Sequence, residues 1–324
     1  MIKTALICGI SGQDGAYLAK LLLDKGYLVH GTARDAQMST FANLRFLGIR
    51  EQITFYSMAL NDFRSVLQVL AKVRPDEIYN LAGQSSVGLS FDQPVETLES
   101  ISVGTLNLLE AVRFIDSPMK LYSAGSSECF GNTGGKPADE DTPFRPRSPY
   151  AVAKAAAFWE VSNYREAYNI FACSGILFNH ESPLRPNRFV TKKIVATACR
   201  IYLGSKEKLC LGDISIMRDW GWAPEYVEAM WLMLQQEEPN DYVIATGESN
   251  SLQSFVEKAF EALALKWRDH IEIDRSLFRP TEIRIGRGNP SKAKELLGWE
   301  ARTKMPQVVE QMIEAELKKL ETET

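Results

Sequence analysis

Thr4-Ala-Leu-Ile-Cys8 is a short apolar run, and Gly9-Ile-Ser-Gly12-Gln-Asp-Gly15 follows it directly. This order predicts a buried strand, a glycine-rich turn and the start of a helix. Glycines let a backbone approach a diphosphate closely, and the N-terminus of a helix offers free N–H groups and a positive dipole. The GxxGxxG spacing differs from the GxGxxG of most dinucleotide-binding loops, and a glycine-rich turn without a ligand is the alternative. We therefore interpret this stretch as a nucleotide-binding loop that decides the fold.

The rest of the first half alternates apolar β-type runs with helical periods. This alternation predicts an α/β fold, a doubly wound parallel Rossmann sheet covered by helices on both faces. The expected strands are Thr4–Cys8, Leu28–Thr32, Ile53–Tyr56, Glu77–Leu81, Leu121–Ala124 and Ala172–Leu177. The expected helices lie around Ala16–Lys25, Phe63–Lys72, Leu98–Phe114 and Tyr150–Tyr168.

The pattern loosens after Phe178, where prolines and basic residues precede short helices and strands. We expect a smaller, discontinuous C-terminal lobe that closes with an amphipathic helix from about Pro306 to Leu320. The predicted Rossmann domain takes residues 1–178 and roughly 213–247, and the predicted substrate-binding domain takes 179–212 and 248–324.

Bulk properties limit the classes of protein to consider. Of 324 residues, 45% are hydrophobic and 24% are charged, which is ordinary for a soluble globular protein. The formal charge of −4 indicates neither a nucleic acid nor a membrane as partner, so a phosphate-bearing ligand would need a local cluster of cations. The five cysteines are scattered without a CxxC pair and there are three histidines, so we expect reduced thiols and no metal site. The first apolar run is too short for a signal peptide or a membrane span, and we expect a cytoplasmic protein.

Two short motifs supply groups that can oxidise a sugar hydroxyl and remove a neighbouring proton. Ser126 and Glu128 follow a predicted strand, and Tyr150 and Lys154 stand at i and i+4 on one helix face. Ser148-Pro149 is typical of a helix N-terminus, which would place Tyr150 in the first turn. A nearby ammonium favours the phenolate, so we expect Tyr150 to lose its proton below its ordinary pKa of about 10 and to act as a general base. Two polar residues on an exposed helix face are the alternative.

The end of the second predicted strand indicates which dinucleotide the loop prefers. An acid there usually binds the ribose hydroxyls of NAD, but this chain has Ala33 in that place and Arg34 just beyond it. A guanidinium without the acid favours the 2′-phosphate of NADP, although Asp35 can partly neutralise Arg34. At the end of the fourth strand, Asn80-Leu-Ala-Gly83-Gln84-Ser85 carries small residues that leave room for a nicotinamide ring, or is a plain exit from strand to loop.

With these motifs, the chain resembles the extended short-chain dehydrogenase/reductases, and among them it closely resembles the GDP-mannose 4,6-dehydratase family. The resemblance covers nearly the whole length, and its most specific stretches lie in the second lobe. It is carried by Gly9–Gly15, Asn80–Ser85, Ser126–Glu128, Ser148–Lys154, Leu177–Arg185, Phe189–Lys193, Arg218–Gly221 and Arg279–Glu282.

The resemblance implies a set of site residues. The implied catalytic residues are Ser126, Glu128, Tyr150 and Lys154. The implied NADP contacts are Gly9, Ser11, Gly12, Gln13, Asp14, Gly15, Arg34, Leu60, Leu81, Ala82 and Gln84, together with Tyr150 and Lys154. The implied contacts to a nucleoside-diphosphate sugar are Ser85, Asn179, Glu181, Arg185, Lys193, Arg218, Arg279 and Glu282. Three of these cations, Lys193, Arg218 and Arg279, would supply the local charge that an acidic protein needs to hold a diphosphate.

The implied reaction converts GDP-D-mannose to GDP-4-keto-6-deoxy-D-mannose. Tyr150, with Lys154 and Ser126, would take the proton of the 4-hydroxyl while NADP accepts the hydride from C4. Glu128 would remove the C5 proton and assist the loss of the 6-hydroxyl as water, and the hydride would return to C6. A 4-epimerase or 4-ketoreductase needs no base at C5. UDP-glucuronate decarboxylases also carry Ser-Glu here, and a glutamate satisfied at a helix N-terminus is the structural alternative.

Four features depart from the family pattern. The family has a threonine where this chain has Ser126, which keeps the hydroxyl. Ala59 occupies the position of an acid that is expected to contact the adenine amine in the family. Gly83 occupies the position of an alanine. Asp35–Leu44 lacks the paired arginines and the Asn-Thr that neighbouring subunits exchange in tetrameric members. We therefore expect at least a homodimer and leave a tetramer open.

Other interpretations remain at this stage. A dehydratase for a larger sugar such as a GDP-heptose and a 4-epimerase or 4-ketoreductase share most of these motifs. A silent NADP-binding redox sensor is a further possibility, but it has no use for an intact hydroxyl, phenol and ammonium. Pro186-Asn-Arg188, where relatives carry more glycine or acid, is expected to alter sugar or phosphate contacts. The subunits are expected to pair through Leu98–Phe114 and Tyr150–Tyr168.

Overall fold

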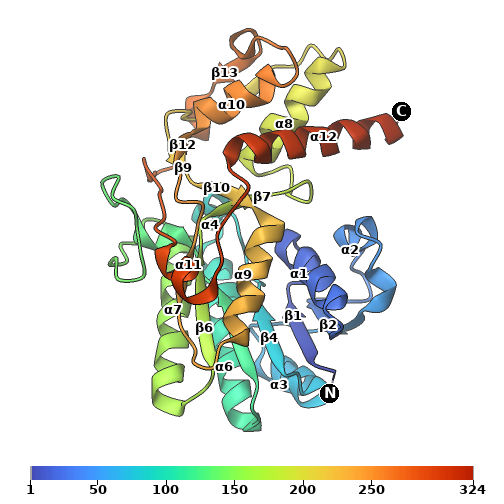
Figure 1. The fold of residues 1–324 in the computed structure, drawn as a ribbon, viewed down its shortest axis with the longest axis vertical. Coiled ribbons are helices and arrows are strands. Elements are labelled where there is room, and N and C mark those ends of the chain that lie inside the picture. Colours follow the sequence, from blue (N-terminus) through green and yellow to red (C-terminus); the bar gives the residue numbers. More distant parts are fainter. Residues whose placement is uncertain (1, 324) are drawn as a thin grey trace.

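The computed structural model describes residues 2–323 and is built on a seven-stranded sheet (Figure 1). The strand order is β11-β6-β5-β4-β1-β2-β3, and every neighbouring pair is parallel. The chain order reverses between β1 and β4, which is where a doubly wound sheet binds its ligand. The strands are β1 Thr4–Cys8, β2 Leu28–Ala33, β3 Thr54–Ser57, β4 Glu77–Asn80, β5 Lys120–Ala124, β6 Ala172–Leu177 and β11 Tyr242–Ile244.

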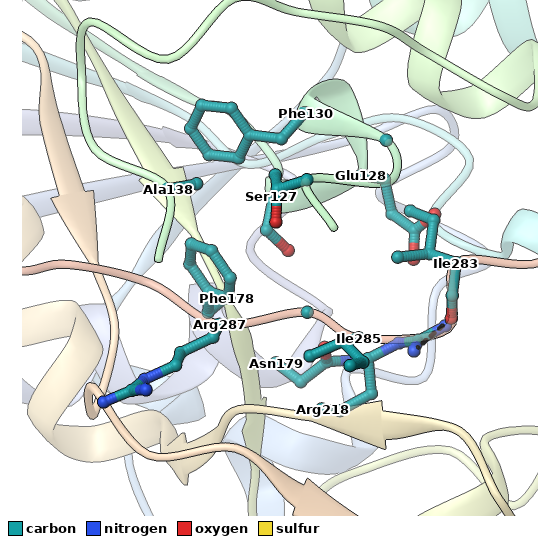
Figure 2. Close-up of a pocket in the computed structure, with 13 residues that line it drawn as sticks. Ser127, Glu128, Phe130, Ala138, Phe178, Asn179, Arg218, Ile283, Ile285 and Arg287 are labelled. Atoms are coloured by element: carbon teal, nitrogen blue, oxygen red, sulfur yellow. Dashed lines mark hydrogen bonds between the residues drawn. The ribbon is translucent and has the colours of Figure 1, made fainter. Parts of the chain in front are cut away.

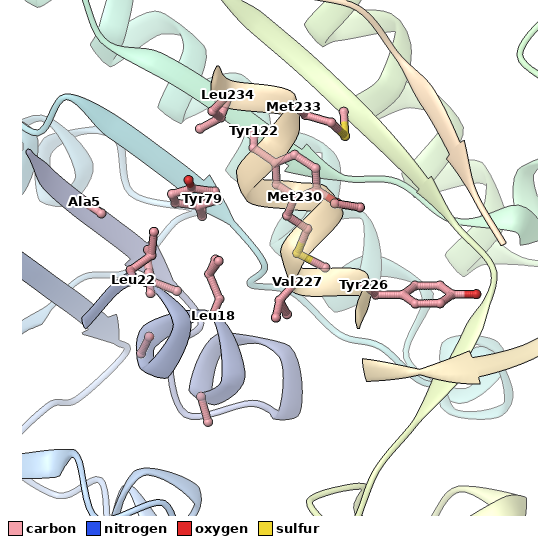
Figure 3. Close-up of a cluster of buried hydrophobic side chains, with 14 of the residues drawn as sticks. Ala5, Leu18, Leu22, Tyr79, Tyr122, Tyr226, Val227, Met230, Met233 and Leu234 are labelled. Carbon is pink, nitrogen blue, oxygen red and sulfur yellow. The ribbon is translucent and has the colours of Figure 1, made fainter. Parts of the chain in front are cut away.

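Helices cover both faces of this sheet, and buried side chains hold them there. Leu18 and Leu22 of α1 pack with Val227 and Met230 of α9 against Tyr79 of β4 (Figure 3). Burial of each such side chain contributes roughly 1.5–3 kcal/mol. One face carries α1 Gln13–Asp24 and α9 Ala223–Gln235, and the other carries α3 Phe63–Val73, α6 Gly104–Ile115 and α7 Pro149–Tyr168. Shorter helices are α2 Ala42–Phe46, α4 Val87–Asp92, α5 Pro94–Leu98 and α11 Ser291–Leu297.

The second lobe lies beyond the carboxyl ends of the sheet strands (Figure 1). Its core joins α8 Val190–Tyr202, α10 Leu252–Glu261 and α12 Met305–Glu323. Lys192 of α8 forms a buried ion pair with Glu316 of α12. Its short strands pair as β7 Asn179–Glu181 with β10 Trp220–Trp222, β9 Met217–Arg218 with β12 Asn250–Ser251, and β8 Leu209–Leu211 with β13 Ile271–Ile273.

The predicted fold class is confirmed, and the ends of the six predicted strands agree within one residue. The predicted N-terminus of α7 is also confirmed, because Ser148 Oγ accepts the N–H of Ala151 at 3.1 Å and Pro149 follows the cap. The strand Tyr242–Ile244 was missed, since three residues are too few for an alternating pattern. The division into two domains stays a prediction.

The helical stretch predicted around Leu98–Phe114 is confirmed, but it is not a regular α-helix throughout. The segment consists of α5, a π-helical turn at Glu99–Val103, and α6. A Cβ on Gly104 would lie 3.0 Å from Cβ of Leu60, so this glycine lets the segment pack closely against the loop after β3. Interruptions of this kind often mark functional sites.

In residues 2–323, none of the helices combines the length and the apolar character that crossing a bilayer requires.

Candidate active site

A cleft of about 730 Å³ opens beside the glycine loop, where β1, β2 and β4 end. Its walls come from α1, the loop after β4 and the segment that follows β7. All of the predicted cofactor contacts outside α7 line it, namely Gly9, Ser11, Gly12, Gln13, Asp14, Gly15, Arg34, Leu60, Leu81, Ala82 and Gln84. The structure therefore brings this set together at the switch point of the sheet, and cofactor binding by these residues stays a prediction.

Two glycines are required by the shape of the loop. Gly9 has a φ of +81°, and a Cβ there would lie 2.9 Å from the backbone of Ala82. A Cβ on Gly15 would lie 2.5 Å from the carbonyl oxygen of Gly9 and 2.6 Å from Cα of Ile10. Because both positions lack a side chain, α1 begins close against the end of β1, and its N-terminal partial charge favours a diphosphate in the cleft.

Arg34 stands at the rim of the cleft, directly after β2. Its side chain is 85% exposed and lies 3.4 Å from the carboxylate of Glu96, an exposed ion pair that contributes little. Asp35 is engaged elsewhere, because its carboxylate accepts the N–H groups of Gln37 and Met38. The guanidinium therefore remains accessible at the place where the sequence predicts a 2′-phosphate.

Several residues of the cleft were not singled out from the sequence. Ser100 lies in the π-helical turn, and its hydroxyl accepts the N–H of Gln84 at 3.2 Å. Arg188, by contrast, belongs to the Pro186-Asn-Arg188 stretch that the sequence singled out, and its Nη2 lies 3.4 Å from the hydroxyl of Ser85. No residue pattern predicts a π-helical turn, so the sequence could not indicate that Ser100 lines the cleft. Other lining residues outside the predicted set include Thr32, Met38, Ser39, Met58, Asn61, Leu89, Gln93 and Glu96.

The predicted hydroxyl, phenol and ammonium come together at the start of α7. Tyr150 and Lys154 lie one turn apart, and Lys154 Nζ is 6.0 Å from the centre of the Tyr150 ring. Lys154 Nζ donates to the carbonyl of Ala124 at 2.7 Å. Ser126 caps the short 3-10 helix Ser127–Phe130, and its hydroxyl hydrogen-bonds with that of Tyr150.

The expected loss of the Tyr150 proton at a lowered pKa is wrong for the protein alone. Burial raises the pKa of Tyr150 above its ordinary value and outweighs the hydrogen bond with Ser126, which lowers it. The Lys154 ammonium is directed to the carbonyl of Ala124, and burial lowers the pKa of Lys154 to about 8. The phenol is therefore held in its protonated form, and a phenolate requires a further positive charge nearby.

Glu128 faces a second cavity, of only about 10 Å³, which it shares with Asn179 of β7 and Arg218 of β9 (Figure 2). Burial raises the pKa of Glu128, and the Glu282 charge adds to this rise, while the charges of Arg218 and Arg279 oppose it. A carboxyl group with a raised pKa is suited both to accept and to return a proton. The cavity is also lined by Phe178, Ile283, Ile285 and Arg287, which sequence reasoning missed.

Two of the predicted phosphate-binding arginines share one carboxylate. Buried Arg218 donates from Nη2 to Glu282 Oε1 at 2.7 Å and from Nη1 to the carbonyl of Ile283 at 2.7 Å. Arg279 Nη1 lies 3.4 Å from the same oxygen of Glu282. One acid thus orients two cations, and the three groups together leave a net positive charge beside Glu128.

The remaining predicted substrate contacts lie in different surroundings. Lys193 Nζ donates to the carbonyl of Cys210 at 2.6 Å. Buried Glu181 pairs with Arg185 at 3.0 Å and accepts the hydroxyl of Thr191 at 2.6 Å, so it positions Arg185, and its direct contact with a substrate stays a prediction. Ser85 and Arg185 line the large cleft, and Asn179 lines the small cavity.

Gln13 and Asp14 line the large cleft, but their side chains bond to the second lobe. Asp14 Oδ2 lies 2.8 Å from Nε2 of His180, and Gln13 Oε1 accepts the hydroxyl of Ser182 at 2.7 Å. No local pattern predicts this contact, because the partners are far apart along the chain.

Comparison with solved structures shows the fold. The UDP-glucose 4-epimerase of Thermotoga maritima superposes with a TM-score of 0.87 at 21% identity, covering 98% of this chain and 99% of that one. The dTDP-glucose 4,6-dehydratase of Bacillus anthracis, solved with NAD, has a TM-score of 0.86 at 20% identity, covering 98% of both chains. RMD from Pseudomonas aeruginosa, solved with NADPH, has a TM-score of 0.80 at 22% identity, covering 98% of this chain and 99% of that one.

Comparison of sequences shows the family. A family model described as GDP-mannose 4,6 dehydratase matches residues 6–312. GDP-mannose 4,6 dehydratase 1 of Arabidopsis thaliana is 48% identical over 325 residues, covering 97% of this chain and 90% of the relative. The GDP-mannose 4,6 dehydratase of Homo sapiens is 43% identical over 345 residues, covering 99% of this chain and 93% of the relative. Because model and relatives match over nearly the whole length, the chain belongs to the GDP-mannose 4,6-dehydratase family.

Proposed function

We propose that this protein is an NADP-dependent GDP-mannose 4,6-dehydratase, which converts GDP-D-mannose to GDP-4-keto-6-deoxy-D-mannose with loss of water. The observation that carries the proposal is the position of Glu128. It lies on the 3-10 helix capped by Ser126, and its carboxyl group faces Arg218 and Asn179 of the second lobe. A sugar held between the lobes would therefore meet an oxidising set on one side and a carboxyl group on the other.

The large cleft suits a nicotinamide dinucleotide. Its floor is the backbone at Gly9 and Gly15, where no side chain fits, and the N-terminus of α1 favours a diphosphate. A cofactor held there by these residues would supply the acceptor for a hydride from C4 of the sugar, the donor of that hydride to C6, and, in its oxidised form, a positive charge. Exposed Arg34 at the end of β2 supports NADP over NAD, since it would pair with the 2′-phosphate.

Tyr150 takes the proton of the sugar 4-hydroxyl in this proposal. Its burial disfavours the phenolate, so the proton transfer depends on nearby positive charge, which Lys154 supplies and an oxidised nicotinamide would increase. Lys154 remains largely protonated at neutral pH, because its lowered pKa of about 8 is still above that pH. Ser126 shares a hydrogen bond with Tyr150 and would hold the reacting hydroxyl in line.

Glu128 then acts on the far side of the sugar. The 4-keto group acidifies the hydrogen on C5, and the Glu128 carboxylate takes that proton. The resulting carboxylic acid passes this proton to the 6-hydroxyl, which leaves as water. Once a hydride has added to C6, C5 needs a new proton, which Glu128 would relay from solvent. The raised pKa of Glu128 suits this double role, because a carboxyl group that binds its proton more firmly is a better base toward C5 and can still pass the proton on.

Arg218 and Arg279 are the proposed ligands of the diphosphate. Glu282 already holds both guanidinium groups in place, so little side-chain entropy is lost when an anion binds. Lys193, whose ammonium now bonds to a carbonyl, would add a third cation. The net positive charge of this cluster also explains how an acidic protein binds an acidic ligand.

We further propose that two copies pair through α5, α6 and α7 and that the protein works in a reducing compartment, the cytoplasm. Large apolar side chains are exposed along this face, including Phe114 at 69% and Trp159 at 60%. Their burial against a second copy would remove an apolar surface from water. The five cysteines are free thiols, which supports the proposed reducing compartment. Light scattering of the protein and of a Trp159→Lys variant tests the dimer, which the variant should weaken.

The test of function is to incubate the purified protein with GDP-mannose and catalytic NADP and to follow the product by mass. The account predicts a product lighter by one water, with no net consumption of NADP. A product of unchanged mass would indicate an epimerase, and net reduction of the cofactor would indicate a simple dehydrogenase. Either result would contradict the proposed function.

A further inference from the structure

The contact between Asp14 and His180 joins the glycine loop to the second lobe. Asp14 lies in the first turn of α1, and His180 is the central residue of β7. His180 Nε2 is 2.8 Å from Asp14 Oδ2, and His180 Nδ1 is 2.8 Å from the carbonyl oxygen of Phe178. Both nitrogens of the ring are thus committed to oxygen atoms.

The chemistry of these oxygens determines where protons must be. The Phe178 carbonyl only accepts hydrogen bonds, so Nδ1 carries a proton and donates it. A neutral ring would then present a lone pair at Nε2 to the carboxylate of Asp14. The 2.8 Å contact therefore needs a second proton between Nε2 and Oδ2.

The surroundings decide that His180 holds this proton. Burial alone would lower the pKa of His180, but the charge and hydrogen bond of Asp14 raise it overall. Burial alone would raise the pKa of Asp14, but His180 lowers it to about 2. Arg185, from the segment after β7, adds a positive charge that favours the Asp14 carboxylate but lowers the pKa of His180, and Tyr226 of α9 stacks on the imidazole with ring centres 4.6 Å apart. The pair is an imidazolium and a carboxylate.

A second pair of side chains, Gln13 and Ser182, also links the glycine loop to the second lobe. The Gln13 amide donates to the carbonyl of His180 at 3.2 Å and accepts the hydroxyl of Ser182 at 2.7 Å. The Ser182 hydroxyl also accepts the N–H of Leu184, at 3.1 Å. The Gln-Asp of the glycine loop is therefore bonded to β7, the strand that begins with Asn179.

We propose that His180 is a positioning residue that cancels the charge of Asp14 beside the cofactor diphosphate and fixes the glycine loop to the substrate lobe. The inference rests on the proposed dinucleotide cofactor. Asp14 stands in the first helical turn, next to the place where the diphosphate would bind. Without the imidazolium, the Asp14 carboxylate would keep the Gln13 amide as a partner, at 2.9 Å, but no compensating charge. It would then repel the diphosphate, and two facing acceptors would open the contact between the lobes.

The test compares NADPH affinity in His180→Gln, Asp14→Asn and the double variant, with His270→Gln, a half-buried histidine that lines neither cavity, as the control. His180→Gln should weaken NADPH binding roughly tenfold, as one uncompensated charge near a diphosphate would do. The double variant should recover most of that loss, because the charge that needs cancelling is gone. A structural role alone would make the double variant at least as weak as His180→Gln, and that result would overturn the proposal.

The pH dependence supplies the second readout. NADPH affinity of the wild type should fall as pH rises through the pKa of His180, and the fall should be absent from Asp14→Asn. Ring-nitrogen NMR reports the proton directly without ligand, since the chain has only three histidines and His180→Gln identifies the signal. A neutral His180 ring at pH 7 in a protein that binds NADPH would contradict this inference alone. A wild type that binds no NADPH would contradict the proposed function instead.

Discussion

The two halves of the candidate active site differ in what shapes them: the backbone shapes one half, and charged side chains shape the other. The floor of the cofactor cleft is shaped by backbone, at Gly9 and Gly15, and Arg34 is exposed at its rim. The sugar-nucleotide side is shaped by charged side chains that are partly buried and paired with one another, above all Arg218 and Glu282. The first half depends on room for the main chain, and the second on electrostatic balance.

The difference predicts how each half responds to change. A substitution at the glycines of the backbone-built cleft should act through sterics and should affect cofactor binding and stability together. A substitution in the charged half should leave the cofactor alone and change rate or pH dependence. A glycine variant that changes only the pH dependence, or a variant of the charged half that weakens cofactor binding, would contradict this comparison.

The largest effect is expected for Glu128→Gln. Removing the proton-transferring carboxyl group should lower kcat by roughly 10²–10⁴-fold, while NADPH affinity stays unchanged. Glu140→Gln is the matched control, because burial also raises the pKa of Glu140 but the residue lines neither cavity. Steady-state kinetics with GDP-mannose and an NADPH titration measure both quantities. A fully active Glu128→Gln enzyme would show that the carboxyl group has no chemical role.

Gly15→Ala should have the next largest effect, this time on the backbone-built half. The new Cβ would lie 2.5 Å from the Gly9 carbonyl oxygen, and overpacking of this kind costs about 1–3 kcal/mol. We expect a lower melting temperature and weaker NADPH binding. Gly88→Ala is the control, since its nearest neighbour is 4.0 Å away. Equal behaviour of the two variants would argue against a close fit between α1 and β1.

Glu282→Gln should shift a pH profile. The Glu282 charge raises the pKa of Glu128, so its removal lets Glu128 ionise at lower pH. The carboxylate is the form that takes the C5 proton, so the acid limb of the kcat profile should move to lower pH. Rates measured across pH 4–9 give the direction. Movement to higher pH would show that Glu128 does not feel Glu282 as proposed.

The smallest effect is expected for Arg34→Ala. An exposed charge contributes up to about 1 kcal/mol, so the preference for NADP over NAD should fall only about fivefold. Arg64→Ala, a substitution of an exposed arginine on α3, is the control. Titrations with both cofactors measure the ratio. A wild type that already binds NAD tenfold more tightly would reverse the assignment of NADP.

Sequence reasoning succeeded where the signal is local. The strand, glycine turn and helix around Gly9–Gly15 follow from adjacent residues, and so does the helical spacing that stacks Tyr150 above Lys154. It failed where the outcome depends on packing between distant segments. The π-helical turn at Glu99–Val103 has no residue signature, and the proton on Tyr150 depends on burial that only the folded chain creates.

The other features that were not predicted from the sequence are the partners of individual side chains. A motif can name Arg218 and Glu282 as site residues, but only the structure shows that they bond to each other at 2.7 Å. Asp14 and His180, separated by 166 positions, are likewise brought together by the docking of the second lobe on α1. Contacts of this kind decide charge and orientation, which a single sequence does not encode locally.

Proton exchange at C5 of the sugar tests the central claim most directly. The enzyme is run on GDP-mannose in deuterium oxide, and the product is analysed by NMR and mass spectrometry. If Glu128 removes and later replaces the C5 hydrogen in contact with solvent, the keto-deoxy product carries deuterium at C5. A dehydrated product with its original hydrogen at C5 would contradict the account.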